Sequence, residues 1–328
     1  MKKTLLRILL VILTLTLVAI PLSACNKKPD DELEMKIYLL NGTTALGASK
    51  LIVDAKNDAL DMNYKIETFT SADQITGAIV SGECVIAALP TNAAANLYKK
   101  SEGKIQLLAI NTLGVLYLLD NGEGVTDFES LKGKTIYLPG AGSNPEFITA
   151  ALIEASGLAA EDITLDTTTY NSPDALATAV SEGNATLAVL PEPKVTVVRS
   201  ANANVKVAMD FTKEWEKLYG ENTLAQGCLV VNTAFAKEHP AEISKFLDDY
   251  KASVEYIAAA SDDAINAIVE AGILPKALIA KKALPNCNIC FIEGADMKAS
   301  ISVFYEKLYA ANNKSIAAIP DDAFYFAR

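Results

Sequence analysis

Few side chains in this sequence could carry acid–base or nucleophilic chemistry. The chain has a single histidine, His239, in the stretch KEHPAE, where it precedes a proline at the start of a helical pattern. We expect this side chain to be exposed and structural. Ser-His-Asp triads, Cys-His pairs and multi-histidine metal sites all require histidines placed beside their partners. The sequence therefore predicts a protein that is not an enzyme and that has no cofactor or metal.

The cysteines give only weak evidence for a site. Cys287 and Cys290 form one CxxC pair in LPNCNICFIEG, and Cys84 and Cys228 stand singly in apolar, strand-like runs. A zinc ribbon would need a second pair at suitable spacing. We therefore favour small buried residues, or one local disulfide outside the cytoplasm, over a metal site.

The N-terminal residues have the pattern of a secretory signal. Basic residues at Lys2, Lys3 and Arg7 precede a long apolar run, which ends in the sequence LSAC at Cys25. This ending resembles the lipobox of bacterial lipoproteins, so residues 1–24 are predicted to be a cleaved signal peptide, with Cys25 lipidated. Residues 25–33 would be a polar tether from the membrane. An ordinary signal peptide with an incidental cysteine is the alternative.

The remaining chain is acidic. The formal net charge is −11, and removal of Lys2, Lys3 and Arg7 with the signal peptide takes it to −14. An acidic surface argues against nucleic acid as a partner. Only two arginines would remain, Arg199 and Arg328. A bidentate arginine clamp for a carboxylate or sulfonate is therefore not expected.

The sequence also repeats itself at an offset of 101 residues. SGECVIAALPTN, starting at Ser81, is echoed by SEGNATLAVLPEP, starting at Ser181, so that Pro90 corresponds to Pro191. Upstream, KIYLLNGTTALGASKLIVDA parallels TIYLPGAGSNPEFITAALIEA. A period of this length is the size of a domain. Strands alternate with helices throughout, which predicts two α/β lobes with mostly parallel sheets.

Local sequence signals, such as helix-capping residues, predict where several helices and strands begin and end. We expect one helix over Thr44–Asn57 and another over Ser71–Ser81, with Ser71 as its N-cap. After a strand at Val205–Met209, the next predicted element is a strand at Gly227–Val231. Beyond it the chain is predicted to be mainly helical.

These motifs resemble a known family. The strand–loop–helix KIYLLNGTTALGASKL, the doubled Leu-Pro pattern, and the stretches FESLKGKTIYLPGAGSNPEF, GCLVVNTAFAKEHPAEISKFLDDYKAS and PDDAFYF are similar to the substrate-binding proteins of bacterial ABC importers. Within these, the chain is most similar to the nitrate/sulfonate/taurine-type group, which shares its fold with pyrimidine-precursor-binding proteins.

The resemblance implies an architecture and a role. It implies a type II periplasmic-binding-protein fold with two crossovers, near Asn111–Val115 and Ala225–Leu229. Lobe 1 would comprise residues 34–111 and 229–328, and lobe 2 residues 112–228. The protein would be a monomer, lipid-anchored to the outer face of the cytoplasmic membrane. It would bind a small solute in the cleft and deliver it to ABC permease subunits.

The expected ligand site lies where strands end and helices begin. Ligands of open α/β sheets meet the carboxyl ends of strands, and helix N-termini hold anionic or carbonyl oxygens. The strand ends would place Thr91 and Asn92 opposite Glu192 across the cleft. The loops before helices and the two crossovers complete the predicted set: Asn41, Gly42, Thr43, Thr44, Gly114, Gly142, Ser143, Asn144 and Gln226.

Ligand charge is the open question at this point. A carboxylate at Glu192 favours a nitrogen-containing solute, pyrimidine-like or zwitterionic, while backbone N–H groups and hydroxyls suit a sulfonate. Tyr38, Tyr137 or Trp215 could supply an aromatic platform, although strand tyrosines more often pack in cores. Two other functions remain as alternatives: a ligand sensor for a membrane receptor, and a pyrimidine-precursor enzyme on the same fold.

Overall fold

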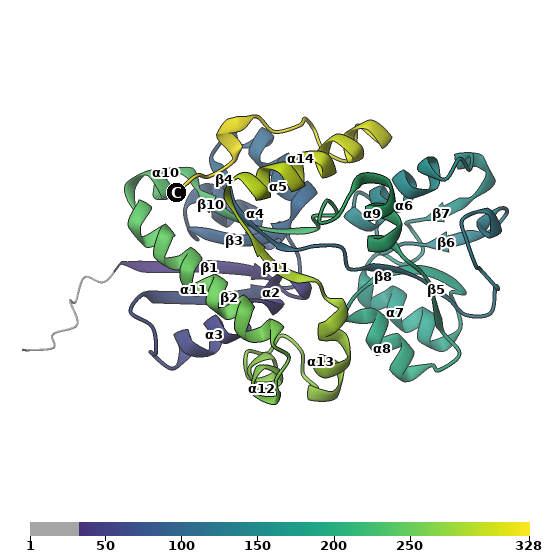
Figure 1. Ribbon diagram of the computed structural model, residues 1–328, viewed down its shortest axis with the longest axis horizontal. Coiled ribbons are helices and arrows are strands. Elements are labelled where there is room, and N and C mark those ends of the chain that lie inside the picture. The colour runs from purple at the N-terminus through teal and green to yellow at the C-terminus, as the bar shows by residue number, and fades with distance from the viewer. Residues whose placement is uncertain (1–32) are drawn as a thin grey trace, which may run out of the picture. The chain divides into compact units, whose positions relative to one another are not determined.

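Strands and helices alternate through most of the chain, and the strands form two sheets (Figure 1). The structure, a computed structural model, describes residues 33–328. The predicted signal peptide, the predicted lipidation site Cys25 and all but the last residue of the predicted tether lie outside these residues. Nothing in the described region is both long and apolar enough to be a membrane-spanning helix.

The first sheet belongs to lobe 1 and has the strand order β11–β4–β10–β3–β1–β2. Strands β1 to β4 share one direction, whereas β10 and β11 run antiparallel to their neighbours. The strands are β1 (Glu34–Leu40), β2 (Asn63–Phe69), β3 (Ile86–Pro90), β4 (Ile105–Thr112), β10 (Gly227–Asn232) and β11 (Ile289–Ile292).

The second sheet belongs to lobe 2 and has the strand order β7–β6–β8–β5–β9. Here only β5 runs antiparallel to its neighbours. The strands are β5 (Leu116–Asp120), β6 (Thr135–Tyr137), β7 (Thr164–Asp166), β8 (Leu187–Pro191) and β9 (Lys206–Asp210).

The two sheets follow one plan, as the sequence repeat predicts. If β10 is matched with β5, the order β2–β1–β3–β10–β4 equals the order β7–β6–β8–β5–β9. In both sheets the chain enters the matched antiparallel strand directly after it leaves the other lobe. Such a strand does not enter through a βαβ connection, which would make it parallel. The expectation of mostly parallel sheets is thus confirmed, and the antiparallel exceptions are the inserted strand in each sheet and the edge strand β11.

Local geometry repeats as well. Gly82 ends one helix with φ 82° and ψ 13°, and Gly183, 101 residues later, ends the equivalent helix with φ 83° and ψ 11°. Both lie in the left-handed region, which glycine adopts without a Cβ penalty. Pro90 and Pro191 each end the strand that follows.

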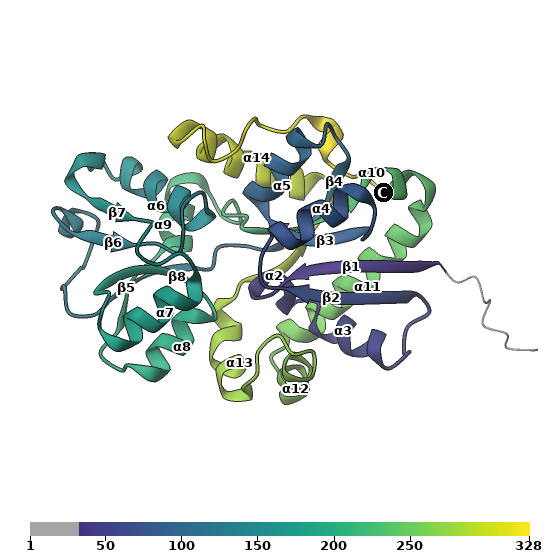
Figure 2. The same cartoon turned by 180° about the vertical axis from the view of Figure 1, so that it is seen from behind.

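Helices cover both faces of each sheet (Figure 2). Helix α14 extends from lobe 1 to lie beside α6 of lobe 2, and Phe304 on α14 packs on Trp215 of α9 with ring centroids 5.6 Å apart. One hydrophobic cluster therefore continues through both lobes. The helices are α2 (Thr43–Leu46), α3 (Ser49–Lys56), α4 (Asp73–Ser81), α5 (Thr91–Lys100), α6 (Asn144–Ala155), α7 (Pro173–Glu182), α8 (Lys194–Ala201), α9 (Phe211–Tyr219), α10 (Thr233–Glu238), α11 (Pro240–Ala258), α12 (Asp262–Glu270), α13 (Ala277–Ala283) and α14 (Gly294–Ala311).

The chain changes sheets twice, between β4 and β5 and between α9 and β10. These two links occupy residues 113–115 and 220–226. The first falls within the range expected near Asn111–Val115, whereas the second begins before the range expected near Ala225–Leu229 and overlaps only its first two residues. The lobe boundaries at residues 111 and 229, and a hinge motion about these links, stay predictions.

Three local expectations were wrong. The helix expected over Thr44–Asn57 is two helices, α2 and α3. The Ser253 hydroxyl accepts from the Leu51 N–H at 3.0 Å and donates to the Gly47 carbonyl at 2.7 Å, so these two backbone groups do not bond each other within one continuous helix. Ser71 is not the N-cap of α4, which starts later, after Ala72. Helix α9 and strand β11 were not predicted.

Candidate functional site

A cavity with a volume of about 380 Å³ lies between the two sheets. This volume falls in the range of small-molecule sites. Its walls come from both lobes and from both crossovers. Eight of the residues predicted from the sequence line it: Asn41, Gly42, Thr43, Thr44, Ser143, Asn144, Glu192 and Gln226.

Proline dominates the apolar lining. The chain contains 12 prolines, and six of them line this cavity: Pro90, Pro139, Pro145, Pro173, Pro191 and Pro193. A proline has no N–H and a fixed φ, so these positions give the cavity rigid walls without backbone donors. Hydrogen bonds to a ligand must therefore come from the few other residues.

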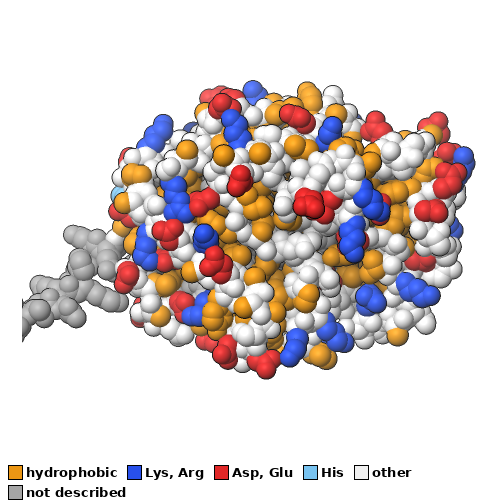
Figure 3. Space-filling model, in the orientation of Figure 1, with side chains coloured by type: hydrophobic (Ala, Val, Ile, Leu, Met, Phe, Trp, Pro, Cys, Tyr) orange, Lys and Arg blue, Asp and Glu red, His pale blue; other side chains and the backbone are white. Residues whose placement is uncertain are grey.

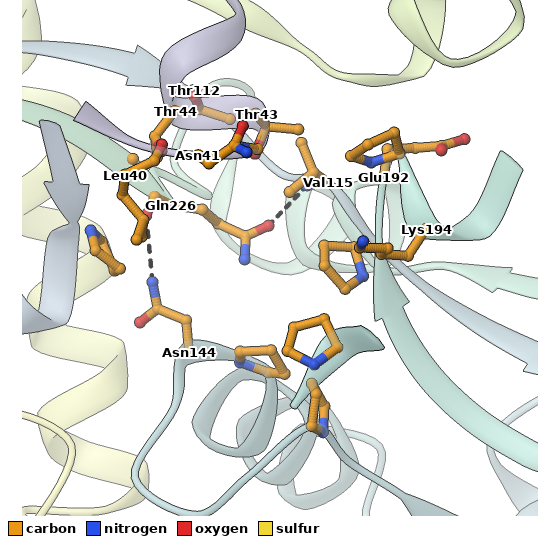
Figure 4. A pocket seen from close by; sticks show the side chains of 18 of the residues that line it. Leu40, Asn41, Thr43, Thr44, Thr112, Val115, Asn144, Glu192, Lys194 and Gln226 are labelled. Carbon is orange, nitrogen blue, oxygen red and sulfur yellow. Dashed lines mark hydrogen bonds between the residues drawn. The ribbon is translucent and has the colours of Figure 1, made fainter. Parts of the chain in front are cut away.

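The wall in lobe 1 is the turn between β1 and α2. Gly42 has a φ of +114°, which allows the sharp turn, and the Asn41 Oδ1 atom accepts from the Gly42 N–H at 2.8 Å. The Thr44 hydroxyl donates to the Leu40 carbonyl at 2.6 Å. The Thr43 hydroxyl has no partner within residues 33–328 and lies at the cavity (Figure 4).

The wall in lobe 2 is the N-terminus of α6. Ser143 is the N-cap residue, but its hydroxyl donates to the Gly140 carbonyl at 2.8 Å instead of capping the helix. The Asn144 Nδ2 atom donates to the Gln226 carbonyl at 3.3 Å. The Asn144 Oδ1 atom is buried and has no partner among the described residues. A buried acceptor without a donor has a free-energy cost, so this atom is suited to a donor from a ligand or water.

Gln226 lies at the back of the cavity, in the second crossover, and is 7% exposed. Its Oε1 atom accepts from the Val115 N–H, in the first crossover, at 2.7 Å. Figure 4 shows the Gln226 amide nitrogen directed into the cavity. Gln226 thus links the two crossovers and presents a donor to the cleft.

Glu192 is buried at the edge of the cavity, and its carboxylate is held by its own helix. Its Oε2 and Oε1 atoms accept from the Thr196 N–H at 3.0 Å and the Thr196 hydroxyl at 2.9 Å. In Figure 4 the carboxylate turns away from Gln226 and Asn144. Burial raises the pKa of Glu192, and the Thr196 hydrogen bonds oppose this shift. The carboxylate that we expected to face the cleft is therefore directed into the N-terminus of α8.

The cavity also contains one ion pair that sequence reasoning did not single out. Lys194, at the start of α8, pairs with Asp174, at the start of α7. The Lys194 side chain is 31% exposed and that of Asp174 is 81% exposed. Pairs this open to solvent contribute little stability. An anionic ligand group could therefore replace Asp174 as the partner of Lys194 at small cost.

Four predicted residues lie outside the cavity lining. The Thr91 hydroxyl, which we expected to face the cleft, is fully buried and donates to the Ala225 carbonyl at 2.7 Å. The Asn92 Nδ2 atom reaches across to the Gly142 carbonyl at 3.4 Å and so joins the lobes. Gly114 packs against Thr212. These residues connect and position the cavity walls.

The aromatic platform considered for Tyr38, Tyr137 or Trp215 is not present, because none of the residues that line the cavity is aromatic. The Tyr38 hydroxyl donates to Glu83, Tyr137 packs on Tyr170, and the Trp215 N–H donates to the Thr223 hydroxyl. All three are used in packing.

Residues from distant parts of the sequence complete the lining. Ile273 and Leu274 follow α12, far along the sequence from every site residue predicted before them. Nothing in their local sequence marks them. Lys194 could have been found, because it lies three residues after Pro191 of the Leu-Pro motif.

The cysteines of the described region and His239 do not line the cavity. All four cysteines in the described region are free thiols, so Cys287 and Cys290 are not joined. Burial raises the pKa of the Cys290 thiol to about 12. His239 is half-buried beside Phe235, with ring centroids 4.5 Å apart, and not exposed as expected.

The charged side chains are interspersed over the surface. On the face shown in Figure 3, acidic and basic groups alternate, with apolar patches between them. The net negative charge is therefore not gathered into one patch on this face.

Three solved structures resemble the chain along most of its length. An ABC transporter from Parabacteroides distasonis has a TM-score of 0.74 at 22% identity, covering 90% of this chain and 99% of its own. The periplasmic aliphatic sulphonate binding protein of Escherichia coli has a TM-score of 0.71 at 14% identity, covering 90% and 92%. The alkanesulfonate-binding protein of Xanthomonas axonopodis pv. citri, bound to MOPS, has a TM-score of 0.66 at 13% identity, covering 88% and 94%.

Comparison of the sequence with family models gives a match to part of the chain. A comparison with curated proteins gave no match. Residues 104–264, from the start of β4 to the start of α12, match the model of the family described as NMT1/THI5 like. The resemblance stated from the sequence motifs is confirmed. The chain therefore has the fold of periplasmic substrate-binding proteins, and its residues 104–264 match the NMT1/THI5 like family model.

Proposed function

We propose that this protein is the extracytoplasmic solute-binding component of an ABC importer. The observation that carries this proposal is the cavity of about 380 Å³ between two lobes, lined from both lobes and both crossovers. A ligand in this position contacts every part that moves when lobes close. The similar structures are named as components of ABC transport or as sulfonate-binding proteins, which supports the same role.

The proposed ligand is a small polar organic solute. The lining has rigid apolar walls from proline and isolated polar groups at Thr43, Asn144 and Gln226. Both lining carboxylates already have partners, since Glu192 is bound by Thr196 and Asp174 by Lys194. This arrangement suits a nitrogen-containing neutral or zwitterionic solute, and through Lys194 it also accommodates a sulfonate.

The proposed location and partners follow from the N-terminal sequence. Cys25 would carry a lipid that anchors the chain to the outer face of the cytoplasmic membrane, and the chain would act there as a monomer that delivers solute to permease subunits. Cys25→Ala should abolish lipid labelling and release the protein from the membrane. A variant that stays labelled and membrane-bound would contradict the lipoprotein assignment.

Calorimetry on residues 26–328 tests the binding function. The probes are MOPS, ethanesulfonate, taurine and cytosine, which cover both ligand classes. We expect at least one probe to bind with one-to-one stoichiometry and to reduce the radius of gyration measured by X-ray scattering. Failure of all four to bind would contradict the proposal that this cavity is a solute site of these classes.

A further inference from the structure

We propose that Gln226 is the residue that couples ligand binding to the crossovers, and that it selects ligands with a hydrogen-bond acceptor at the back of the cleft. This inference rests on the proposed solute-binding function and deepens it. It comes from the position of one residue that belongs to the second crossover, bonds to the first crossover through its side chain, and keeps one free donor.

The orientation of the Gln226 amide is fixed by its contacts. The Val115 N–H can only donate, so the atom that faces it at 2.7 Å must be the Oε1 oxygen. The amide nitrogen then occupies the other position on the planar amide, and Figure 4 shows it directed into the cavity. The residue is 7% exposed, and none of residues 33–328 accepts a hydrogen bond from this nitrogen.

The backbone of Gln226 ties together both lobes. Its N–H donates to the Thr112 carbonyl at 3.0 Å, at the end of β4. Its carbonyl accepts from the Thr91 N–H at 3.1 Å and from the Asn144 Nδ2 atom at 3.3 Å. Thr91 begins α5 in lobe 1, and Asn144 begins α6 in lobe 2. Gln226 is thus hydrogen-bonded to both lobes and, through Val115, to the other crossover.

The free Nε2 donor sets a requirement on the ligand. In a closed and desolvated cleft, a donor without an acceptor is unfavourable. A ligand oxygen or ring nitrogen at this place satisfies the donor, whereas water satisfies it when the cleft is open. Ligands that place a carbonyl, carboxylate, sulfonate or ring-nitrogen acceptor against Gln226 therefore favour the closed form, and ligands that place an apolar group there do not.

Two substitutions separate the two roles of the side chain. Gln226→Glu keeps an acceptor for the Val115 N–H but, when ionised, has no donor for a ligand. Gln226→Met is neutral and of similar length, and lacks both. Gln106→Glu is the matched control, because the Gln106 amide donates to the Ala323 carbonyl at 3.0 Å at an exposed position.

The measurements are calorimetry with MOPS, taurine and cytosine, hydrogen exchange of the Val115 amide, and X-ray scattering with and without the probe that binds. At pH 8, Gln226→Glu should weaken binding roughly ten- to a hundredfold, the range for a lost hydrogen bond in a buried site, and should keep the Val115 amide protected. As the pH is lowered, protonation of the new carboxyl restores a donor, so affinity should recover. Gln226→Met should lose both affinity and Val115 protection, and should stay expanded at saturating probe.

The outcomes distinguish this inference from the proposed function. If wild type binds a probe and both Gln226 variants bind it within twofold, the inference is wrong and the solute-binding function stands. Equal compaction of wild type and Gln226→Met would refute the coupling to the crossovers. If wild type binds none of the probes, the solute-binding function fails and the inference fails with it.

Discussion

Alanine at Gly114 should destabilise the protein, because the first crossover passes very close to α9. A Cβ at this position would lie 2.2 Å from the Thr212 hydroxyl oxygen and 2.6 Å from the Leu224 Cδ2 atom. Ordinary contacts of this kind start at about 3.4 Å. Both neighbours are largely buried, at 9% and 1% exposure. The backbone or the neighbours would therefore have to move by about an ångström, and such overpacking typically costs about 1–3 kcal/mol.

The assay is thermal unfolding followed by circular dichroism. At roughly 2–3 °C per kcal/mol for a chain of this size, Gly114→Ala should lower the unfolding midpoint by about 2–9 °C. Gly77→Ala is the matched control, because it adds the same methyl inside helix α4 where nothing lies within 4 Å. That control should leave stability equal or raise it by about 0.5–1 kcal/mol.

The result also decides how Gly114 contributes to the site. If Gly114→Ala unfolds at the wild-type midpoint but loses affinity for a bound probe, Gly114 contacts the ligand, as the sequence suggested, and the packing argument is refuted. Lower stability with affinity largely retained would support the packing role.

Three further predictions concern charge and the interlobe contact. Lys194→Met should weaken MOPS binding at least tenfold and leave cytosine binding within twofold, as measured by calorimetry; equal effects on both probes would exclude a direct contact with the sulfonate. Because burial raises the pKa of Glu192 above its ordinary value, the protonated carboxyl stabilises the fold below about pH 4.5, and that stability is lost as the pH rises through the raised pKa. Glutamine does not ionise, so Glu192→Gln should not lose stability as the pH rises. The unfolding midpoint of the variant should therefore exceed that of wild type by more at pH 7 than at pH 4. The same difference at both pH values would contradict this account of Glu192. Phe304→Ala should cost about 3–5 kcal/mol and shift the emission of Trp215, the single tryptophan, to longer wavelength; an unchanged spectrum would show that the two rings do not pack.

Much of the fold could be predicted because its signals are local. The Leu-Pro ends of β3 and β8, the left-handed glycines Gly82 and Gly183, and the N-cap Ser172, whose hydroxyl accepts from the Ala175 N–H, act within a few residues. The repeat of these signals at one offset predicted two sheets of one plan. Helix α9 was missed although a local signal was present: Asp210 ends β9, and its side chain caps the helix by accepting from the Thr212 and Lys213 N–H groups.

The candidate site was only partly predictable, because only some of its residues are marked by a local sequence pattern. Asn41 to Thr44 and Ser143 to Asn144 stand beside glycines in loops between a strand and a helix, which is a local pattern. Thr91 and Glu192 occupy equivalent strand ends in the sequence, yet the structure buries the first under the second crossover and turns the second into its own helix.

The sequence by itself determined the alternation of strands and helices, the duplication of the lobes, the shortage of catalytic side chains and the loops that surround the cleft. Each of these depends on residues near one another in the chain. The tertiary structure alone decided which donors remain free, because that depends on partners far away in sequence: Val115 holds the Gln226 oxygen across 111 positions, and Asn144 reaches the Gln226 carbonyl across 82. A polar side chain becomes available to a ligand only when the fold leaves it without a partner, and no local pattern records that outcome.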